Sequence, residues 1–201
     1  MAEKMDIEKK KVITPKFRVS FPNVFKPKAF EDQAPKYSIV MLFDKDEDIK
    51  AMRKAAFNAA IEKWGSKAKF PKGMKMPFRD GSEREDTQGY EDTIFVTASA
   101  KEDKRPGLVD KKRRPILDPE DFYAGCYARA EVIAFAYDKA GNKGVSFSLC
   151  NIQKMGDGEA FTGRRAAEDV FDSVDDGEDD EDYYNDEDGF DDGEDENDMG
   201  F

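Results

Sequence analysis

The sequence contains no histidine, the side chain that most often serves as a general base, a metal ligand or the partner of a nucleophilic serine or cysteine. It also contains neither G-x-x-x-x-G-K-[ST] nor G-x-G-x-x-G, so nucleotide-driven motors and dinucleotide-dependent enzymes have no support. Hydrolases and nucleotide-using enzymes are therefore disfavoured. We expect no enzyme activity, no cofactor and no metal.

Cysteine and long apolar runs are also scarce. Cys126 and Cys150 are the two cysteines, and no apolar leader follows the opening MAEKMDIEKKKV. A secreted disulfide framework has no support, and both thiols are expected to be reduced and buried. No apolar run reaches the roughly 18 residues of a membrane-spanning helix, so we expect a soluble protein without a membrane contact.

Cations are missing from the last part of the chain. All 33 Lys and Arg residues lie at or before Arg165, whereas 19 of the 45 Asp and Glu residues lie from Glu168 onward. The first part thus sets 33 cations against 26 acids, a net charge of +7, and the end carries −19. This asymmetry is typical of a cationic binding body with a polyanionic arm.

Apolar residues alternate with polar ones in several short segments, which predicts half-buried strands. In the segment from Val12, Phe17, Val19 and Phe21 alternate with Arg18 and Ser20. Further strands are predicted in PKYSIVMLFD and TIFVTASAK, and the stretch 126–154 predicts a hairpin turning at DKAGNKG.

One helix is predicted after the second strand, with Asp46 as its N-cap and Gly65 as its end. Two long irregular segments, 66–92 and 102–125, read as loops. The fold class is therefore mostly β: a Greek-key barrel resembling the OB fold, with long loop insertions, and a β-sandwich as the alternative. The predicted parts are a flexible N-terminus (1–11), the OB-fold domain (12–167) and a disordered acidic tail (168–201).

Basic residues interleaved with aromatic ones are the remaining signal, and they favour binding of single-stranded nucleic acid. Lys111, Lys112, Arg113 and Arg114 form one cationic run, which is either a phosphate-binding loop or a merely solvated one. In FPKGMKMPFR, Phe70 and Phe78 lie among cations, where the rings either stack on bases or pack the loop against the barrel.

The first strand of the predicted hairpin has nearly all alanine at its even positions and larger residues at its odd ones. For Ile133 and Phe135 we favour the barrel interior. Tyr127 and Arg129, near one end of the strand, are better candidates for contact with nucleic acid.

A metal-dependent nuclease is the weakest alternative. Asp118 and Glu131 superficially resemble paired magnesium ligands, but Ile133 stands where one common nuclease arrangement has a lysine. Solvated or turn carboxylates explain such isolated acids better.

Several ordered blocks resemble the Enc-type family of phage single-stranded DNA-binding proteins. The blocks run from about Val12 to Glu159 and include FRVSFPNVFKPKAF, PKYSIVMLF, PFRDGSE, RPGLVD, DPEDFYAGCYARAEVIAFAYD and GNKGVSFSLCNIQKMGDGE. The ending DDGEDENDMGF is similar to the acidic tails with a terminal phenylalanine found in other single-stranded DNA-binding proteins. VSFSLCNIQK departs from the family near Ser148 and Cys150, where a glycine and a second asparagine are expected.

The resemblance implies sequence-independent binding of single-stranded DNA on an OB barrel, in phage DNA replication, recombination or repair, in the cytoplasm of the infected bacterium. The tail is expected to compete with DNA and to recruit phage or host replication proteins through Phe201; a homo-oligomer is left open. The residues expected to contact DNA are Arg18, Lys36, Tyr37, Lys72, Lys75, Phe78, Arg79, Lys111, Lys112, Arg113, Arg114, Tyr123, Tyr127 and Arg129.

Two alternatives stay open besides the nuclease. An RNA-binding or RNA-chaperone OB-fold protein has the same features, because a stacking platform does not itself exclude the 2′-hydroxyl. An acidic interaction protein would act through its tail instead of its body.

Overall fold

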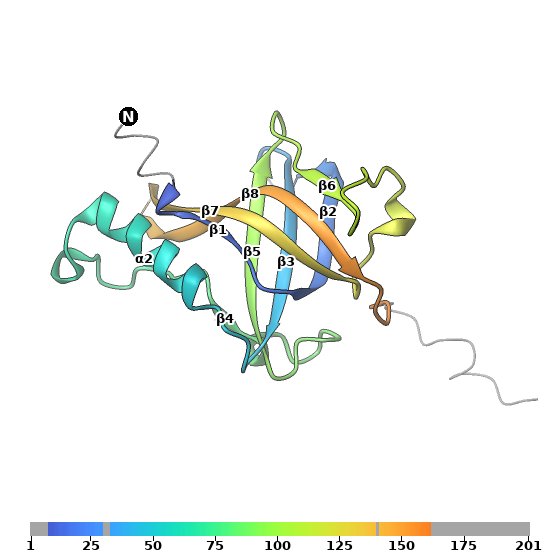
Figure 1. Ribbon diagram of the computed structural model, residues 1–201. Helices are drawn as coiled ribbons and strands as arrows, with labels where there is room; N and C mark the ends of the chain where they lie inside the picture. Colours follow the sequence, from blue (N-terminus) through green and yellow to red (C-terminus); the bar gives the residue numbers. More distant parts are fainter. Residues whose placement is uncertain (1–7, 30–32, 140, 162–201) are drawn as a thin grey trace, which may run out of the picture. The chain divides into compact units, whose positions relative to one another are not determined.

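The computed structural model describes residues 8–29, 33–139 and 141–161 (Figure 1). The chain divides into two units, Met1–Gly163 and Arg164–Phe201, and all described residues belong to the first. The predicted disordered tail, 168–201, lies outside the described residues, as does most of the predicted flexible N-terminus.

The strand predicted from Val12 is two strands, β1 (Lys11–Ile13) and β2 (Phe17–Lys28). They separate at Pro15, which has no N–H for a ladder. Thr14 holds the chain to the neighbouring strand, because its backbone N–H donates to the Ala130 carbonyl at 2.8 Å and its hydroxyl accepts from the Ala130 N–H at 3.0 Å. β2 begins alongside the same strand, with Phe17 opposite Ala128, and then pairs with the next strand in the sheet.

The two central strands follow the predicted boundaries closely. β3 (Lys36–Asp44) and β5 (Thr93–Lys101) pair antiparallel along their full lengths, from Lys36 opposite Lys101 to Asp44 opposite Thr93. β2 pairs with the other edge of β3, and the short β4 (Arg79–Asp80) adds to β5. These strands make one curved sheet.

The predicted hairpin closes this sheet into a barrel. β7 (Tyr127–Lys139) and β8 (Asn142–Gly156) pair antiparallel, and β8 runs parallel to β5 where Ala98 lies opposite Phe147. β7 pairs in turn with β2, so the closed order is β2-β3-β5-β8-β7-β2. This Greek-key order with one parallel pair is that of an OB-fold barrel, which confirms the predicted fold class over the sandwich. β6 (Gly107–Val109) runs parallel to the far end of β8.

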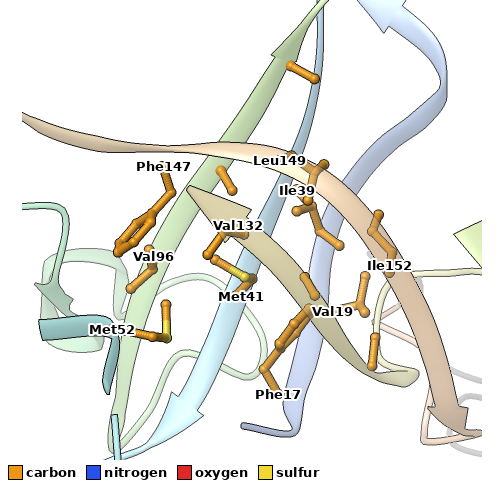
Figure 2. Close-up of a cluster of buried hydrophobic side chains, with 14 of the residues drawn as sticks. Phe17, Val19, Ile39, Met41, Met52, Val96, Val132, Phe147, Leu149 and Ile152 are labelled. Carbon is orange, nitrogen blue, oxygen red and sulfur yellow. The ribbon is translucent and has the colours of Figure 1, made fainter. Parts of the chain in front are cut away.

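The barrel interior is filled by alternate residues of all five long strands (Figure 2). The fully buried side chains shown there include Val19, Ile39, Met41, Val96 and Phe147. β7 contributes only small residues to this interior, namely Ala128, Ala130, Val132 and Ala134, because Phe17 of β2 and Phe147 and Leu149 of β8 already occupy the space.

The orientation predicted for two large residues of β7 is therefore wrong. Phe135 is 40% exposed and Ile133 is half-buried, both on the outer face, because the alanine face of the strand is the one that fits the narrow barrel.

The predicted helix is α2 (Lys50–Trp64), which packs its alanine-rich face against β7, β8 and β1. Its end at Gly65, with φ of +85°, is as predicted. The predicted N-cap is wrong: the helix begins four residues after Asp46, and Asp48 Oδ1 accepts the backbone N–H of Lys50 at 2.9 Å. Phe57 and Ile61 remain 38% and 39% exposed on its outer face.

The two predicted loops contain three short 3-10 helices: η1 (Lys67–Lys69), η2 (Gly81–Arg84) and η3 (Pro119–Asp121). The first loop is pinned to the hairpin, since the Lys75 N–H donates to the Lys143 carbonyl and the Val145 N–H donates to the Lys75 carbonyl, both at 2.9 Å. Tyr90, near its end, is fully buried against Phe95. None of the described helices has the length and apolarity to span a membrane.

Candidate nucleic-acid interface

The outer face of the barrel carries a continuous row of side chains where β5, β8 and β7 meet. β5 and β8 pair only at Ala98–Phe147 and Ser99–Ser148, so the two strands diverge on either side of this contact. Two hollows result. Thr97 and Ser99 are successive outward residues of β5, and because outward positions recur every second residue, the hollows that they line adjoin.

The first hollow, here called the Phe135 groove, has a volume of about 1000 Å³ and an apolar floor. Ile133 and Phe135 form much of that floor. Its lining also includes Lys36, Ser99, Lys101, Lys104, Ser148 and Cys150. Neither Lys101 nor Lys104 forms an ion pair with a described carboxylate, although Glu102 and Asp103 lie beside them. The groove combines an exposed aromatic ring, on which a base can stack, with cations that can bind the phosphates of the strand.

The second hollow, the Arg79 groove, has a volume of about 720 Å³ and lies next along the same strands. Its lining includes Lys75, Met76, Phe78, Arg79, Glu83, Thr97, Tyr137 and Ser146. Arg79 Nε donates to Glu83 Oε2 at 2.9 Å, and this hydrogen bond is the main reason that the pKa of Glu83 is lowered. The groove therefore holds one anion that is already matched by a cation.

Four of the predicted contact residues line these grooves: Lys36 in the Phe135 groove, and Lys75, Phe78 and Arg79 in the Arg79 groove. Phe78 also packs edge-on against Phe147, with 6.0 Å between ring centroids, under the Arg53 guanidinium. Phe70 packs against Phe57 and Trp64 instead, so the packing alternative holds for it. Lys72 is exposed and lines neither groove.

Tyr37 is the predicted contact residue that the structure places in the core. It is 8% exposed and belongs to the main buried cluster, because it points inward from β3 beside Ile39 and Met41. Its ring has no face left for a base, so we remove it from the proposed contacts.

A second group of predicted residues lies at the other end of β7, around Tyr127. The Lys16 ammonium and the Arg18 guanidinium lie 5.0 and 5.8 Å from the centroid of this ring. Arg18 also donates to the backbone carbonyls of Gly125 at 3.2 Å and Glu159 at 2.9 Å. Arg18 thus ties the start of β2 to the segment after β8 and keeps its charge beside a half-exposed ring.

The hydroxyl group of Tyr123 forms hydrogen bonds within the protein. Its hydroxyl donates to the Gly158 carbonyl at 3.1 Å and to Asp157 Oδ1 at 3.2 Å. Lys154 lies 5.3 Å from the centroid of the ring and forms an ion pair with Asp157 at 2.7 Å, and this hydrogen bond is the first cause of the lowered pKa of Asp157. We interpret these contacts as holding the loop in place, which makes Tyr123 a weaker candidate for stacking on a base.

The predicted cationic run forms a turn held by Asp110. Asp110 Oδ1 accepts the backbone N–H groups of Lys112 at 2.8 Å and Arg114 at 2.9 Å, and Oδ2 forms an ion pair with Arg114 at 2.7 Å. Arg113 sits at φ of +64° within the turn. Arg114 is therefore occupied in holding the turn, while Lys112 and Arg113 are exposed and pair with no described carboxylate.

A glutamine joins this turn to the barrel. Gln153 Nε2 donates to the Asp110 carbonyl at 3.1 Å, and its Oε1 accepts from Arg129 Nε at 2.9 Å. Arg129 thus positions the turn, although its side chain is exposed. Apart from Tyr37 and Lys72, the predicted residues fall into two groups, one in the grooves and one around Tyr127 and the cationic turn. Between them on β7 stands Glu131, which bonds to Lys11 and Asn151.

The two acids of the nuclease alternative have structural roles instead. Asp118 Oδ1 accepts the Glu120 N–H at 2.9 Å as the cap of η3, and Lys11 and then Asn151 lower the pKa of Glu131. Among residues 8–29, 33–139 and 141–161, no group of three Cys, Asp or Glu residues is placed to hold a metal ion.

Sequence reasoning missed several groove residues: Ser99, Lys101, Lys104, Ile133, Phe135 and Tyr137. For those on β7 the signal was present in the alanines at the even positions. In a narrow barrel, small residues mark the inner face, so the large residues between them face outward.

A family model and a curated relative both match this chain over most of its length. A family model described as "Enterobacter phage Enc34, ssDNA-binding protein" matches residues 10–184. Protein p50 of Acyrthosiphon pisum secondary endosymbiont phage 1 is 36% identical over 160 residues, which is 73% of this chain and 83% of p50.

Two solved structures share the fold. The single-stranded DNA-binding protein of bacteriophage Enc34, in complex with single-stranded DNA, aligns with a TM-score of 0.65 at 22% identity, covering 76% of this chain and 89% of that one. The single-stranded DNA-binding protein gp2.5 of bacteriophage T7 aligns with a TM-score of 0.57 at 13% identity, covering 84% and 96%.

Proposed function

This chain belongs to the family of the single-stranded DNA-binding protein of Enterobacter phage Enc34, and we propose that it binds single-stranded DNA along the Phe135 and Arg79 grooves. The observation that carries the proposal is the outward row on β5, β8 and β7. Phe135 is 40% exposed there with Lys36, Lys101 and Lys104 around it. A large ring at a solvent-facing position of a strand is accounted for by a flat ligand that covers it.

The binding is proposed to be independent of base sequence. Ring faces stack on any base, and lysine side chains bind phosphates without reading a base edge. Serine and threonine hydroxyls between the rings, such as Ser99 and Thr97, add contacts to the backbone of the strand. A protein that binds single strands more tightly than duplex coats exposed DNA and shifts hairpins toward the open form by mass action.

A role in phage DNA replication, recombination or repair, in the cytoplasm of the infected bacterium, follows as a proposal from this binding. We further propose that the acidic segment 168–201 competes with DNA for the cationic body. Its charge of −19 is tethered to the body, which gives it a high effective concentration there. Phe201 is proposed to enter an apolar pocket of a replication protein, with the neighbouring acids meeting cations at the rim of that pocket.

The direct test is a salt titration of binding to oligo-dT, to a matched RNA and to a duplex, with the full chain and with a chain ending at residue 167. We expect oligo-dT to bind most tightly, and deletion to strengthen binding at low salt. Tighter binding to RNA would favour the RNA alternative, and unchanged affinity after deletion would refute competition by the tail. Loss of DNA binding on deletion would favour an acidic interaction protein.

The Phe201 proposal has a separate test. Removing Phe201 alone should leave oligo-dT affinity unchanged and abolish capture of the phage polymerase by the full chain. Retained capture would refute it.

A further inference from the structure

The backbone of Phe21 has a conformation that large side chains rarely adopt. Its φ is +44°, in the left-handed region that favours glycine, and it precedes Pro22, which restricts the preceding residue toward extended conformations. Its side chain is 51% exposed although it lies in the middle of β2. A strained residue that holds an aromatic ring in solvent is a candidate for a functional contact.

The strain comes from a β-bulge that turns Phe21 away from the core. Ser20 lies opposite Val40 and Asn23 opposite Ser38, so β2 has one more residue than β3 between these pairs. In a regular strand Phe21 would follow Phe17 and Val19 into the barrel, as its alternation predicts. That prediction is wrong because the bulge gives the next inward place to Val24, which is 2% exposed.

Hydrogen bonds hold this bulge in place. Asn23 Nδ2 donates to the Phe21 carbonyl and to Ser38 Oγ, both at 3.4 Å. The Ser20 hydroxyl lies 3.3 Å from the hydroxyl of Tyr90, which is fully buried. The ring of Phe21 is thus presented by a fixed frame on β2 and β3.

A cation stands beside the ring. The Arg84 guanidinium, on η2, lies 5.8 Å from the centroid of Phe21, and Arg84 Nη1 donates to the Tyr90 hydroxyl at 3.4 Å. Arg84 pairs with no carboxylate among the described residues. The guanidinium groups of Arg79 and Arg84 both lie over the ring of Phe95, at 4.8 and 5.3 Å from its centroid. Arg84 therefore lies next to the Arg79 groove.

We propose that Phe21 stacks on an unpaired base while Arg84 binds a neighbouring phosphate, which extends the path of the DNA from the Arg79 groove, past the two guanidinium groups over Phe95, onto β2. This inference rests on the proposed function and adds a contact that neither groove contains. A base suits the site better than a protein partner, because a single ring lies beside the Arg84 guanidinium and Asn23 bonds to the backbone that carries it. A docking surface for a protein needs a broader apolar patch.

Binding of full-length Phe21→Ala, Phe21→Gly, Phe21→Tyr and Arg84→Gln to oligo-dT over a range of salt tests the proposal. Phe21→Ala and Phe21→Gly should weaken binding by about 5- to 150-fold, the loss expected for one stacked base, with an unchanged salt dependence. Phe21→Tyr keeps the ring and should bind within about threefold of the wild type. Arg84→Gln should reduce the slope of log K against log salt by about 0.7.

Phe21→Gly controls for stability, since glycine tolerates the positive φ and should unfold at or above the wild-type temperature. Leu117→Ala is the matched surface control. Leu117 is 78% exposed and lines neither groove, so the affinity of this variant for oligo-dT should equal that of the wild type. If the wild type binds oligo-dT and both Phe21→Ala and Phe21→Gly bind equally well, the inference is wrong while the proposed function stands. If these variants instead change the oligomeric state at unchanged DNA affinity, the ring serves a protein interface and the inference is likewise wrong. A wild type that does not bind would refute the proposed function itself.

Discussion

Arg79 and Glu83, four residues apart in the chain, form an ion pair at the rim of the Arg79 groove. Arg79 Nε donates to Glu83 Oε2 at 2.9 Å. Both side chains are about half exposed, at 49% and 45%. The pair joins β4 to η2 and keeps beside a carboxylate the one arginine that, among the described residues, lines either groove. A DNA phosphate at this place has to compete with Glu83 for Arg79.

Replacing Glu83 with glutamine should therefore strengthen binding to oligo-dT, by about 1.4- to fivefold, because an exposed pair contributes only about 0.2–1 kcal/mol. The salt dependence should become steeper as Arg79 becomes available to phosphate. Fluorescence titrations of both proteins measure the change, with Glu120→Gln in η3 as the control outside the grooves. Weaker binding of Glu83→Gln would show that the pair positions Arg79 for DNA.

The same pair predicts a pH dependence. Because Arg79 lowers the pKa of Glu83, the carboxylate stays charged until the pH falls below its usual value of about 4.3. Protonation below that pH removes the competing anion, so the affinity ratio of Glu83→Gln to wild type should approach one as the pH falls through the lowered pKa. A ratio that stays constant while the Glu83 carboxyl becomes protonated, as followed by NMR, would contradict this.

Phe135→Ala should weaken binding to oligo-dT by about 5- to 150-fold, because one stacked base is worth about 1–3 kcal/mol. The melting temperature should change little, since the ring is 40% exposed and faces away from the barrel interior. Leu117→Ala is again the control. Unchanged affinity of Phe135→Ala, with wild-type binding intact, would move the binding surface away from the Phe135 groove.

Asp110→Asn should loosen the cationic turn of Lys111–Arg114. The backbone N–H of Arg114, followed by its guanidinium, lowers the pKa of Asp110, so the ionised form is the one that holds the turn. A group with a lowered folded pKa stabilises above its unfolded pKa of about 3.9, and this contribution disappears as the pH falls through the folded value. Hydrogen exchange at neutral pH should be faster for the amides of Lys112 and Arg114 in the variant. Equal protection in both proteins would show that Gln153 and the backbone hydrogen bonds between Asp110 and Arg114 hold the turn without the carboxylate.

Phe147→Ala should lower the free energy of unfolding by about 3–5 kcal/mol, because it leaves a cavity in the barrel. Phe147 is fully buried and contacts Phe78, so the variant also removes a support of the Arg79 groove. Urea unfolding measures the change. A loss below about 1 kcal/mol would mean that the surrounding side chains close the cavity.

The strands and the hairpin were predictable because alternation and turn chemistry are local. The boundaries of β3 and β5 and the turn between β7 and β8 agree with the patterns in their own segments. The closing contact between β5 and β8 is parallel and joins residues about fifty positions apart, and no local pattern encodes it.

Most of the predictions that were wrong concern the directions in which side chains point, and these directions depend on tertiary packing. Alternation leaves open which of two faces points inward, and for β7 the narrow interior selected alanine over Ile133 and Phe135. Alternation also presumes a regular ladder, which the bulge at Phe21 interrupts. Tyr37 has the chemistry of a stacking residue, but its inward position on β3 was set by pairing with β2 and β5.

Single-stranded DNA is proposed to lie along the outer row of β5, β8 and β7. Photo-cross-linking of the full-length protein to oligo-dT substituted with 5-iododeoxyuridine, followed by mass spectrometry of the peptides, tests it most directly. We expect cross-links to Phe135 or Tyr137 of the grooves, and to Phe21 on β2. Cross-links confined to other surfaces, such as Phe57 on the outer face of α2, would contradict it.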